Sequence, residues 1–208
     1  MPAPILHLTH HRNLPSILGT GGLWSPNHRP PECVVQQSSA YENLQNVRAQ
    51  RIVPCGPGGN LHDYTPFYFG ERSPMLYANH RGFVRCNPEG QGPLIYLVSS
   101  AERIQAEGHG FVFTDGHALH AYTRYFDDLH HLSDIDWPTV HTHQWANRED
   151  DPDRKRRKQS EFLVYRFMPV SLIESVVVLN HEIRTIVQQI FCDRGVDLPV
   201  RIDGSWYY

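Results

Sequence analysis

The chain of 208 residues has the composition of one globular domain, with 40% hydrophobic and 20% charged residues. Its net charge of −3 excludes a broadly basic nucleic-acid-binding surface, and no apolar run reaches the roughly 20 residues of a membrane helix. The four cysteines include no C-x-x-C pair, and the N-terminus MPAPILHLTHHRN has neither the basic start nor the long apolar stretch of a signal peptide. We therefore expect a cytoplasmic protein with free thiols and no membrane partner.

The N-terminal quarter of the chain predicts one strand, two helices and a long loop. A strand is expected over residues 5–9, and a short helix follows over 14–18 until the sequence GTGG ends it. Residues 25–37 are rich in Pro, Gln and Asn and predict a loop. A second helix is expected over residues 38–51, with Ser38 or the next serine as its N-cap, before the turn-rich sequence PCGPGG.

The rest of the chain predicts short strands, several of them consecutive. These strands cover residues 64–69, 94–99, 111–114, 162–166, 176–179 and 200–206. A helix capped by Asp115 is expected to carry an apolar stripe at Leu119, Tyr122, Phe126 and Leu129. Residues 182–191 predict another helix. Because consecutive strands lack intervening helices, the pattern favours a single α+β domain over residues 1–208 rather than a doubly wound parallel sheet.

Glu161 stands at the start of a predicted strand in which neither face is purely apolar. A period of two places it on the opposite face from Phe162 and Val164. Five consecutive basic residues, 154–158, precede it, and a glutamate at a strand end most often pairs with such neighbours. The irregular stretch that leads to it, residues 133–159, is longer than a routine connection and indicates a functional loop.

Histidine pairs are the first candidates for a metal site. His117 and His120 stand three residues apart, and another pair stands two apart at 141 and 143, but neither joins a carboxylate–histidine pattern of zincin or deaminase spacing. The sequence therefore predicts no metal. The Gly-rich run at 56–59 lacks the Gly-Lys-Ser/Thr of a phosphate-binding loop, and the sequence has no G-x-S-x-G nucleophile motif.

Six ordered blocks of sequence carry a family resemblance across nearly the whole chain. They are HLTHHRNLPSIL (7–18), GGNLHDYTPFYFGERSPMLY (58–77), FVFTDGHA (111–118), DIDWP (134–138), KQSEFLVY (158–165) and the closing SWYY. Together these blocks resemble the DarT family of DNA ADP-ribosyltransferase toxins, from DarT–DarG toxin–antitoxin systems, in its thymidine-modifying branch.

The resemblance implies an ADP-ribosyltransferase-like split mixed β-sheet with helices and a long substrate-recognition loop over residues 116–161. NAD is then the ADP-ribose donor, bound in part by an element over residues 35–53. The side chains expected to bind NAD are His7, Leu8, Thr9, Ser16, Trp24 and Arg48. Glu161 falls at the position of the catalytic glutamate, where a carboxylate orients the ribose and stabilises its oxocarbenium-like charge as nicotinamide departs.

Arg48 matches the functional arginine of the family and is expected to be catalytic, with Arg51 as the rival one turn further on. A guanidinium is nearly always protonated, so we do not expect it to act as a free base. The two remaining roles are to clamp the NAD phosphates or to lower the cost of deprotonating thymine at N3.

The resemblance further implies a toxin that modifies thymidine in single-stranded DNA and meets a macrodomain antitoxin. Aromatic and basic side chains in the long loop suit a single-stranded DNA groove. Those expected to bind DNA are His117, His120, Tyr122, His143, Trp145 and Arg154. We expect a monomer.

Three other functions compete with this hypothesis. An NAD-dependent RNA 2′-phosphotransferase also begins with a His-x-Thr/His type of motif, but it relies on arginines and needs no catalytic glutamate, so Glu161 separates the two. A non-catalytic nucleic-acid-binding module would tolerate loss of Glu161. A metal-dependent nuclease would be silenced by chelators.

Overall fold

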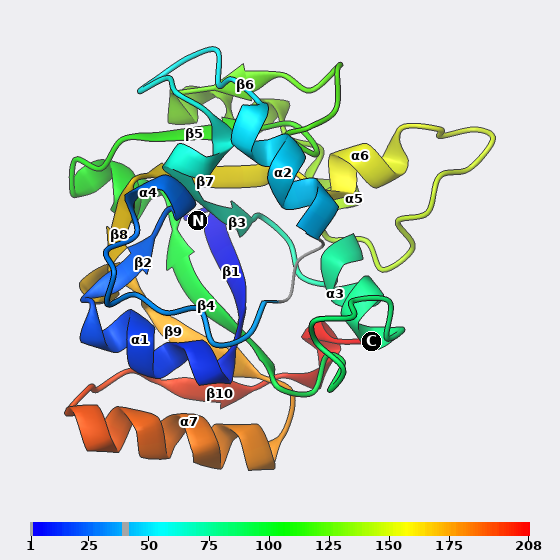
Figure 1. The fold of residues 1–208 in the computed structure, drawn as a ribbon. Helices are drawn as coiled ribbons and strands as arrows, with labels where there is room; N and C mark the ends of the chain where they lie inside the picture. Colours follow the sequence, from blue (N-terminus) through cyan, green and yellow to red (C-terminus); the bar gives the residue numbers. More distant parts are fainter. Residues whose placement is uncertain (1, 39–41) are drawn as a thin grey trace.

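A computed structural model describes residues 2–38 and 42–208, which fold around an eight-stranded mixed sheet (Figure 1). The strand order is β10-β9-β4-β1-β3-β7-β5-β6, and among these described pairs only β10–β9 is parallel. The strands are β1 (Pro4–His10), β3 (Tyr64–Tyr68), β4 (Leu94–Ser100), β5 (Phe111–Thr114), β6 (Tyr125–Phe126), β7 (Glu161–Tyr165), β9 (Ser175–Val178) and β10 (Val200–Ile202). A separate ribbon pairs β2 (Gly22–Trp24) with β8 (Phe167–Pro169).

Short helices connect these strands. The α-helices are α1 (Leu14–Gly19), α2 (Glu42–Gln50), α3 (Pro74–His80), α4 (Ala101–Ala106), α5 (Trp137–Val140), α6 (Arg154–Lys158) and α7 (His181–Arg194). The 3₁₀ helices are η1 (His11–Asn13), η2 (Pro26–His28), η3 (Leu61–Asp63), η4 (Leu129–Asp134), η5 (Val170–Leu172) and η6 (Gly204–Trp206). Helix α7 lies along β10 at the bottom of Figure 1, whereas α3 and α6 lie on its right-hand side and α2 lies nearer the middle. In the described part of the chain, no helix has the length and apolar character to cross a membrane.

The sheet is split between β1 and β3. These strands pair at a single position, Leu6↔Tyr68, whereas β1 pairs with β4 over all seven of its residues. The next residue along β1, His7, therefore lies where the two halves of the sheet begin to separate. The predicted α+β fold with a split mixed sheet is confirmed.

Most predicted elements are present with shifted ends. The last predicted strand ends early, at Ile202, and continues as η6. The second helix was predicted over residues 38–51, but residues 39–41, which include one of its two predicted caps, lie outside the described part of the chain. The described helix runs over Glu42–Gln50. Helices α3 and α4 occur where the sequence predicts none, and the stretch 133–159 contains α5 and α6.

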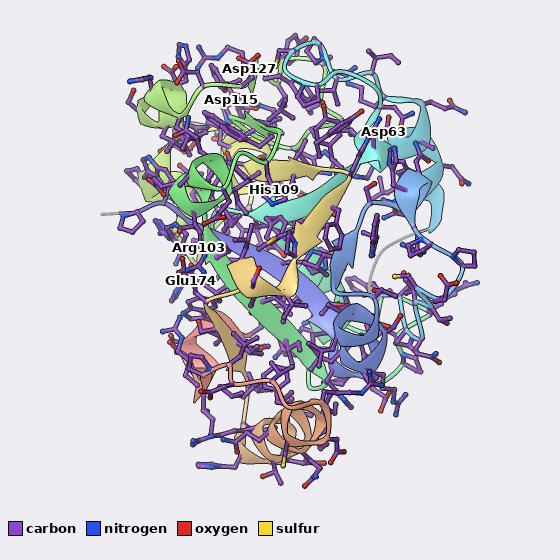
Figure 2. All side chains as sticks on the ribbon, turned by 90° about the vertical axis from the view of Figure 1, so that its left-hand side faces the viewer. Asp63, Arg103, His109, Asp115, Asp127 and Glu174 are labelled. Carbon is purple, nitrogen blue, oxygen red and sulfur yellow. The ribbon has the colours of Figure 1, made fainter. Side chains whose placement is uncertain are left out.

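The helix predicted after Asp115 is wrong. The chain instead turns back as β6, which pairs antiparallel with β5. The Asp115 carboxylate accepts hydrogen bonds from the backbone nitrogen and Nε of Arg124, both at 3.0 Å, and from Nη1 of Arg156 at 2.8 Å. It lies near Asp127 at one end of the molecule (Figure 2). These tertiary bonds take the side chain that would otherwise cap a helix, and they fasten the start of the long loop to α6.

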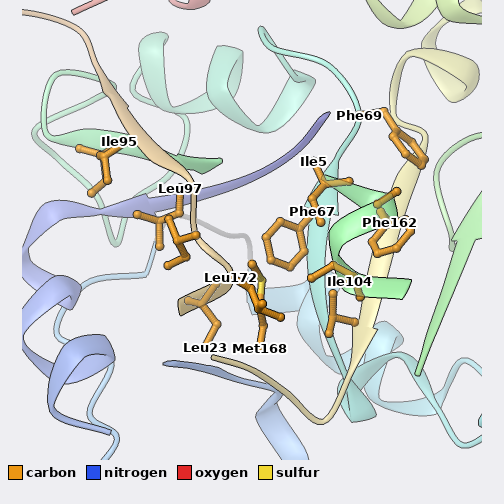
Figure 3. Close-up of a cluster of buried hydrophobic side chains, with 14 of the residues drawn as sticks. Ile5, Leu23, Phe67, Phe69, Ile95, Leu97, Ile104, Phe162, Met168 and Leu172 are labelled. Atoms are coloured by element: carbon orange, nitrogen blue, oxygen red, sulfur yellow. The ribbon is translucent and has the colours of Figure 1, made fainter. Parts of the chain in front are cut away.

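The main hydrophobic core lies on one face of the sheet. Ile5, Phe67 and Phe162 of β1, β3 and β7 meet there (Figure 3), and each is at most 1% exposed. Full burial of such a side chain stabilises the fold by roughly 1.5–3 kcal/mol. Leu6, the next residue after Ile5, belongs to a second cluster, as the alternation of a strand requires. Since Phe162 faces the main core, Glu161 points to the other face of β7.

Candidate active site

A pocket of about 490 Å³ opens on that other face of β7. It is lined by residues from β1, β3, α2, α3, the turn after β5 and the segment that precedes β7. Six of the predicted catalytic, NAD-binding and DNA-binding residues line it: His7, Leu8, Arg48, His117, Trp145 and Glu161. Residues far apart in the sequence, from both sides of the split in the sheet, therefore meet in one cavity.

Glu161 is held at the pocket by the strand pairing and by its neighbours. It lies opposite Tyr68 in the β3–β7 pair, and its carboxylate is 4% exposed. Oε2 lies 2.9 Å from Nη2 of Arg48, while Oε1 accepts a hydrogen bond of 2.9 Å from the backbone nitrogen of Ala118. Sequence analysis missed the role of Ala118, because a backbone donor leaves no mark in the sequence.

The charge state of Glu161 follows from these contacts. Burial raises the pKa of the carboxyl. The positive charge of Arg48 and the electrostatic interaction with His117 lower it, and the hydrogen bonds from Arg48 and from the Ala118 backbone lower it further. The pKa of Glu161 is therefore below its ordinary value. The side chain is an anion at neutral pH.

Arg48 shares this environment and remains a cation. Burial lowers the pKa of its guanidinium, but the charge of Glu161 and its hydrogen bond raise that pKa by more, so the net shift is upward. Arg51 lies one turn on and does not line the pocket; its Nη2 donates to the carbonyl of His120 at 3.5 Å. The structure thus brings Arg48, rather than Arg51, against the carboxylate.

His7 is a neutral imidazole with a defined tautomer. Its Nδ1 lies 2.8 Å from the carbonyl oxygen of Pro66. Burial lowers the pKa of His7, and the bond to Pro66 offsets this only in part. Because a carbonyl can only accept, Nδ1 carries the proton and Nε2 is left as an acceptor at the pocket.

Thr9, Ser16 and Trp24 do not line the pocket. Thr9 is buried and accepts a hydrogen bond of 3.0 Å from the Asn13 amide. The Ser16 hydroxyl accepts the Val34 amide at 2.8 Å, which holds the loop before α2 against α1. The Trp24 ring contacts that of a phenylalanine of β8, with centroids 4.2 Å apart and the ring planes tilted by 35°. Of these three residues, Ser16 contacts the loop that leads to α2 directly.

Asn13 performs a related role that sequence analysis missed. Its amide nitrogen donates to the carbonyl of Gln37 at 2.9 Å, and its amide oxygen accepts the Gln37 backbone nitrogen at 3.1 Å. This two-point contact fastens the loop that leads into α2. The signal was present, since Asn13 lies within the block HLTHHRNLPSIL, but the local pattern did not indicate a partner 24 residues away.

The residues predicted to bind DNA are spread over two environments. His117 lines the pocket, and its Nδ1 accepts the Leu119 amide at 3.2 Å. Burial lowers the pKa of His117, although the charge of Glu161 raises it in part. His120 and Tyr122 lie outside the pocket, with the Tyr122 side chain 81% exposed.

The other predicted DNA-binding residues lie on the loop before α6. Trp145 lines the pocket, whereas His143 and Arg154 do not. The Arg154 guanidinium donates to the Gln144 carbonyl at 2.6 Å and to the Thr142 hydroxyl at 3.2 Å. Arg154 therefore holds the shape of the loop.

Lys158 is an unexpected buried cation close to Glu161. It is 1% exposed, and Nζ donates to the carbonyls of Glu71 at 2.7 Å and Val140 at 2.6 Å. Burial lowers its pKa to about 8. A Cβ at Gly70 would lie 2.4 Å from the Val140 oxygen, so glycine permits the close approach of these two backbones. Lys158 ties the segment before Glu161 to the turn after β3 and to α5.

No group of three or more His, Cys, Asp or Glu side chains within residues 2–38 and 42–208 is placed to hold a metal ion. The pocket instead presents one buried anion, one buried cation, a neutral imidazole acceptor and aromatic rings. Such a set suits a ligand that carries amide and hydroxyl groups beside a centre that becomes positively charged in the reaction.

Comparison with known proteins agrees with this chemistry. The family model described as ssDNA thymidine ADP-ribosyltransferase, DarT, matches residues 6–208. The DNA ADP-ribosyl transferase of Thermus aquaticus is 43% identical over 211 residues, which cover 100% of this chain and 90% of that protein. The structure of Thermus sp. 2.9 DarT in complex with ADP-ribosylated ssDNA superposes with a TM-score of 0.94 at 40% identity. The match covers 100% of this chain and 97% of that one. The structure of the same Thermus protein in complex with NAD+ superposes with a TM-score of 0.90 at 39% identity, and the match covers 100% of this chain and 98% of that one. The chain therefore belongs to the DarT family of single-stranded DNA thymidine ADP-ribosyltransferases.

Proposed function

We propose that this protein transfers ADP-ribose from NAD to thymidine in single-stranded DNA, and that Glu161 and Arg48 carry the reaction. The observation that supports these two roles is the buried pair itself: carboxylate and guanidinium lie 2.9 Å apart in the pocket, with side chains 4% and 11% exposed. In the transfer, the bond between ribose C1′ and nicotinamide breaks, a bond from C1′ to the base forms, and the base loses a proton.

Glu161 acts on the ribose. As nicotinamide leaves, positive charge develops on the sugar, and a fixed carboxylate close to it stabilises that charge without having to reorganise. Its lowered pKa keeps the group ionised, and the Ala118 amide and Arg48 fix the orientation of both oxygens. A carboxylate held in this way also accepts a hydrogen bond from the ribose 2′-hydroxyl.

Arg48 acts as a permanent cation beside the reacting centre. Its raised pKa excludes a role as a free base, so the proton of the base must leave by another route. A nearby cation stabilises the anion that forms when thymine loses its N3 proton, or it binds a phosphate of NAD. Both roles depend on the position of Arg48 on α2, within the element over residues 35–53 that we assign to NAD.

NAD binding involves His7 and Leu8, which line the pocket on β1. The Nε2 acceptor of His7 suits the amide of nicotinamide or a ribose hydroxyl. Thr9, Ser16 and Trp24 contribute indirectly, through hydrogen bonds to Asn13, to the loop before α2 and to the end of α1.

Single-stranded DNA approaches over the segment 116–161, which we assign to substrate recognition. His117 and Trp145 lie at the pocket, and the exposed ring of Tyr122 offers a further stacking platform. Base–aromatic stacking is worth roughly 1–3 kcal/mol per base, so a few such rings suffice despite the net charge of −3. His120, His143 and Arg154 complete the DNA-binding set that we propose. By family resemblance, the protein acts in the cytoplasm as a monomeric toxin that a macrodomain antitoxin counters.

The test uses radiolabelled NAD with matched oligonucleotides. We expect label on a thymidine-containing single strand, little on the same sequence as a duplex, where the base edge is hidden, and none when thymidine is replaced by cytidine. The Glu161→Gln variant provides the background. Label on RNA or protein alone would overturn the proposal and favour the RNA-modifying alternative.

A further inference from the structure

Thr114, the last residue of β5, is a buried polar residue that the proposed reaction does not use. Its side chain is 0% exposed and does not line the pocket. Strand β5 pairs with β7 up to Phe113↔Phe162, whereas Thr114 pairs with Tyr125 of β6. The pairing of β5 with β7 therefore ends one residue before Glu161, and the Thr114 hydroxyl lies at this end.

The Thr114 hydroxyl joins the backbone of Glu161 to the turn after β5. It accepts a hydrogen bond of 3.1 Å from the Glu161 backbone nitrogen and donates to the carbonyl of Gly116 at 2.7 Å. Its contact with the Glu161 carbonyl is longer, at 3.4 Å, so the single hydroxyl proton is directed to Gly116. Two residues further on, the Ala118 backbone nitrogen donates to Oε1 of Glu161 at 2.9 Å. The chain and these three bonds form a closed ring.

Other contacts hold the same turn from its far side. The backbone nitrogen of His117 donates to the carbonyl of Arg156 at 2.9 Å. The carbonyl of Ala118 accepts a hydrogen bond of 2.5 Å from the hydroxyl of Tyr125. These two contacts fasten the turn to α6 and β6, and the Thr114 hydroxyl fastens it to β7. The direction of the Ala118 N–H bond follows from all three attachments.

We propose that Thr114 is a positioning residue for the transfer reaction, whose hydroxyl aims the Ala118 amide at the Glu161 carboxylate. This inference rests on the proposed role of Glu161 in stabilising the charge that develops on the ribose. A hydrogen bond weakens steeply when its angle is lost, and a displacement of about 1 Å at a reacting group can cost on the order of a hundred-fold in rate. Without the hydroxyl, the turn loses its attachment to the strand that carries Glu161.

The charge of Glu161 gives this role a distinct signature. The bond from Ala118 is one of the contacts that lower the pKa of the carboxyl, so a displaced turn raises that pKa. Because the anion is the active form, activity is lost as the pH falls through this pKa. A higher pKa therefore moves the acid limb of the pH profile to higher pH. A substitution at residue 114 leaves in place the other titratable groups that interact with Glu161, which are Arg48, His117, Tyr68 and Tyr125.

The experiment separates the hydroxyl of Thr114 from its methyl group. Thr114→Val keeps the shape of the side chain but removes the hydroxyl, whereas Thr114→Ser keeps the hydroxyl but removes a buried methyl. If Thr114→Val does not fold, Thr114→Cys takes its place, because a thiol is a weak donor. Ser99→Ala is the matched control, since it removes another buried strand hydroxyl, which donates to the Leu172 carbonyl at 2.7 Å and does not line the pocket.

The measurement is kcat for label transfer as a function of pH, beside NAD affinity and thermal stability. Saturating NAD keeps the protonation of His7 out of the profile. We expect Thr114→Val to lower kcat by about tenfold or more and to move the acid limb to higher pH, with NAD affinity unchanged. Thr114→Ser should keep the wild-type kcat and pH profile, although the loss of its methyl makes it less stable. Ser99→Ala should also match the wild type in both.

Three results would overturn the inference alone. Thr114→Val keeps the wild-type kcat, or it loses kcat while the acid limb stays in place, or Thr114→Ser loses as much activity as Thr114→Val. Each would show that the hydroxyl contributes to folding or packing and does not aim the Ala118 amide. Absence of label on every DNA strand with wild-type protein, or full activity of Glu161→Gln, would instead overturn the proposed function, and this inference with it.

Discussion

Arg48 of α2 and Glu161 of β7 form an ion pair of 2.9 Å in which both side chains are almost fully buried. The pair joins the helix before the Gly-rich turn to the strand after the long loop, so it closes the pocket from two sides. Removing one member of a buried pair leaves the other as an uncompensated charge, which is strongly destabilising. Substitutions at this pair must therefore be interpreted together with stability measurements.

The first prediction concerns the charge of Glu161. Glu161→Gln keeps the size of the side chain but removes the anion, so transfer should fall by on the order of a hundred- to thousand-fold. NAD affinity should change little, because the carboxylate matters most when charge develops in the transition state. The measurements are label incorporation and NAD calorimetry at matched thermal stability.

Glu174→Gln is the matched control for this change. Glu174 is partly exposed, pairs with Arg103 at 3.9 Å and does not line the pocket; Figure 2 shows these two residues side by side. We expect normal transfer from this variant. Near-normal transfer by Glu161→Gln, or a loss explained by unfolding, would mean that the ion pair is only structural.

The second prediction separates Arg48 of α2 from Arg51, the residue that follows the helix. Arg48→Lys keeps a positive charge but loses the planar guanidinium, so kcat/KM should fall at least tenfold. Arg51→Lys should stay close to wild type, because Arg51 contacts the carbonyl of His120 and does not line the pocket. A larger loss from Arg51→Lys than from Arg48→Lys would reverse the assignment of the functional arginine.

Local pattern in the sequence predicted much of the fold but only part of the site. The strand that begins at Glu161 was recognisable as a short apolar stretch with one carboxylate at its start. In the structure, both faces of this strand are packed. The helix expected after Asp115 does not form, although its apolar residues have helical spacing. The Asp115 carboxylate, which would cap that helix, is bonded to Arg124 and Arg156 instead. Tertiary bonds of this kind override local preference.

The basic run before Glu161 shows why other parts of the site could not be predicted. Residues 154–158 have the composition of a solvated segment, yet Lys158 is buried, while Arg156 and Arg157 pair with Asp153 and Asp136. Which of the five side chains is buried depends on backbone carbonyls from distant turns. No local pattern encodes that, although the family resemblance covers the block that contains Lys158.

The third prediction concerns His7. His7→Ala should weaken NAD binding as well as turnover, because it removes the Nε2 acceptor at the pocket. Since burial lowers the pKa of His7, protonation sets in only below the ordinary value of 6.5. NAD affinity should therefore be constant above pH 6.5 and decline below it as the acceptor is lost.

The control for His7 is His109→Ala, because His109 lies before β5 and does not line the pocket (Figure 2). This variant should keep the wild-type pH profile and NAD affinity. An affinity that rises as the pH falls below 6.5 would show that the protonated imidazole binds the phosphates of NAD.

The last prediction uses the buried ammonium of Lys158. Its pKa is about 8 in the folded protein and 10.5 when exposed, so between these values the unfolded chain binds more protons than the native one. The free energy of unfolding that depends on Lys158 therefore rises as the pH increases from about 8 to 10.5, by about 3 kcal/mol. The neutral amine still has two N–H groups, enough to donate to the carbonyls of Glu71 and Val140.

The measurement is the difference in urea unfolding free energy between wild type and Lys158→Met as a function of pH. This subtraction removes the groups that titrate in both proteins. We expect a positive slope above pH 8, whereas the same subtraction with Lys155→Met, at an exposed position of α6, should show no such slope. A flat difference for Lys158→Met would show that the ammonium retains its ordinary pKa, and therefore that water reaches it between β3 and α5. The two hydrogen bonds by which Lys158 ties the segment before Glu161 to the turn after β3 and to α5 would then be open to solvent.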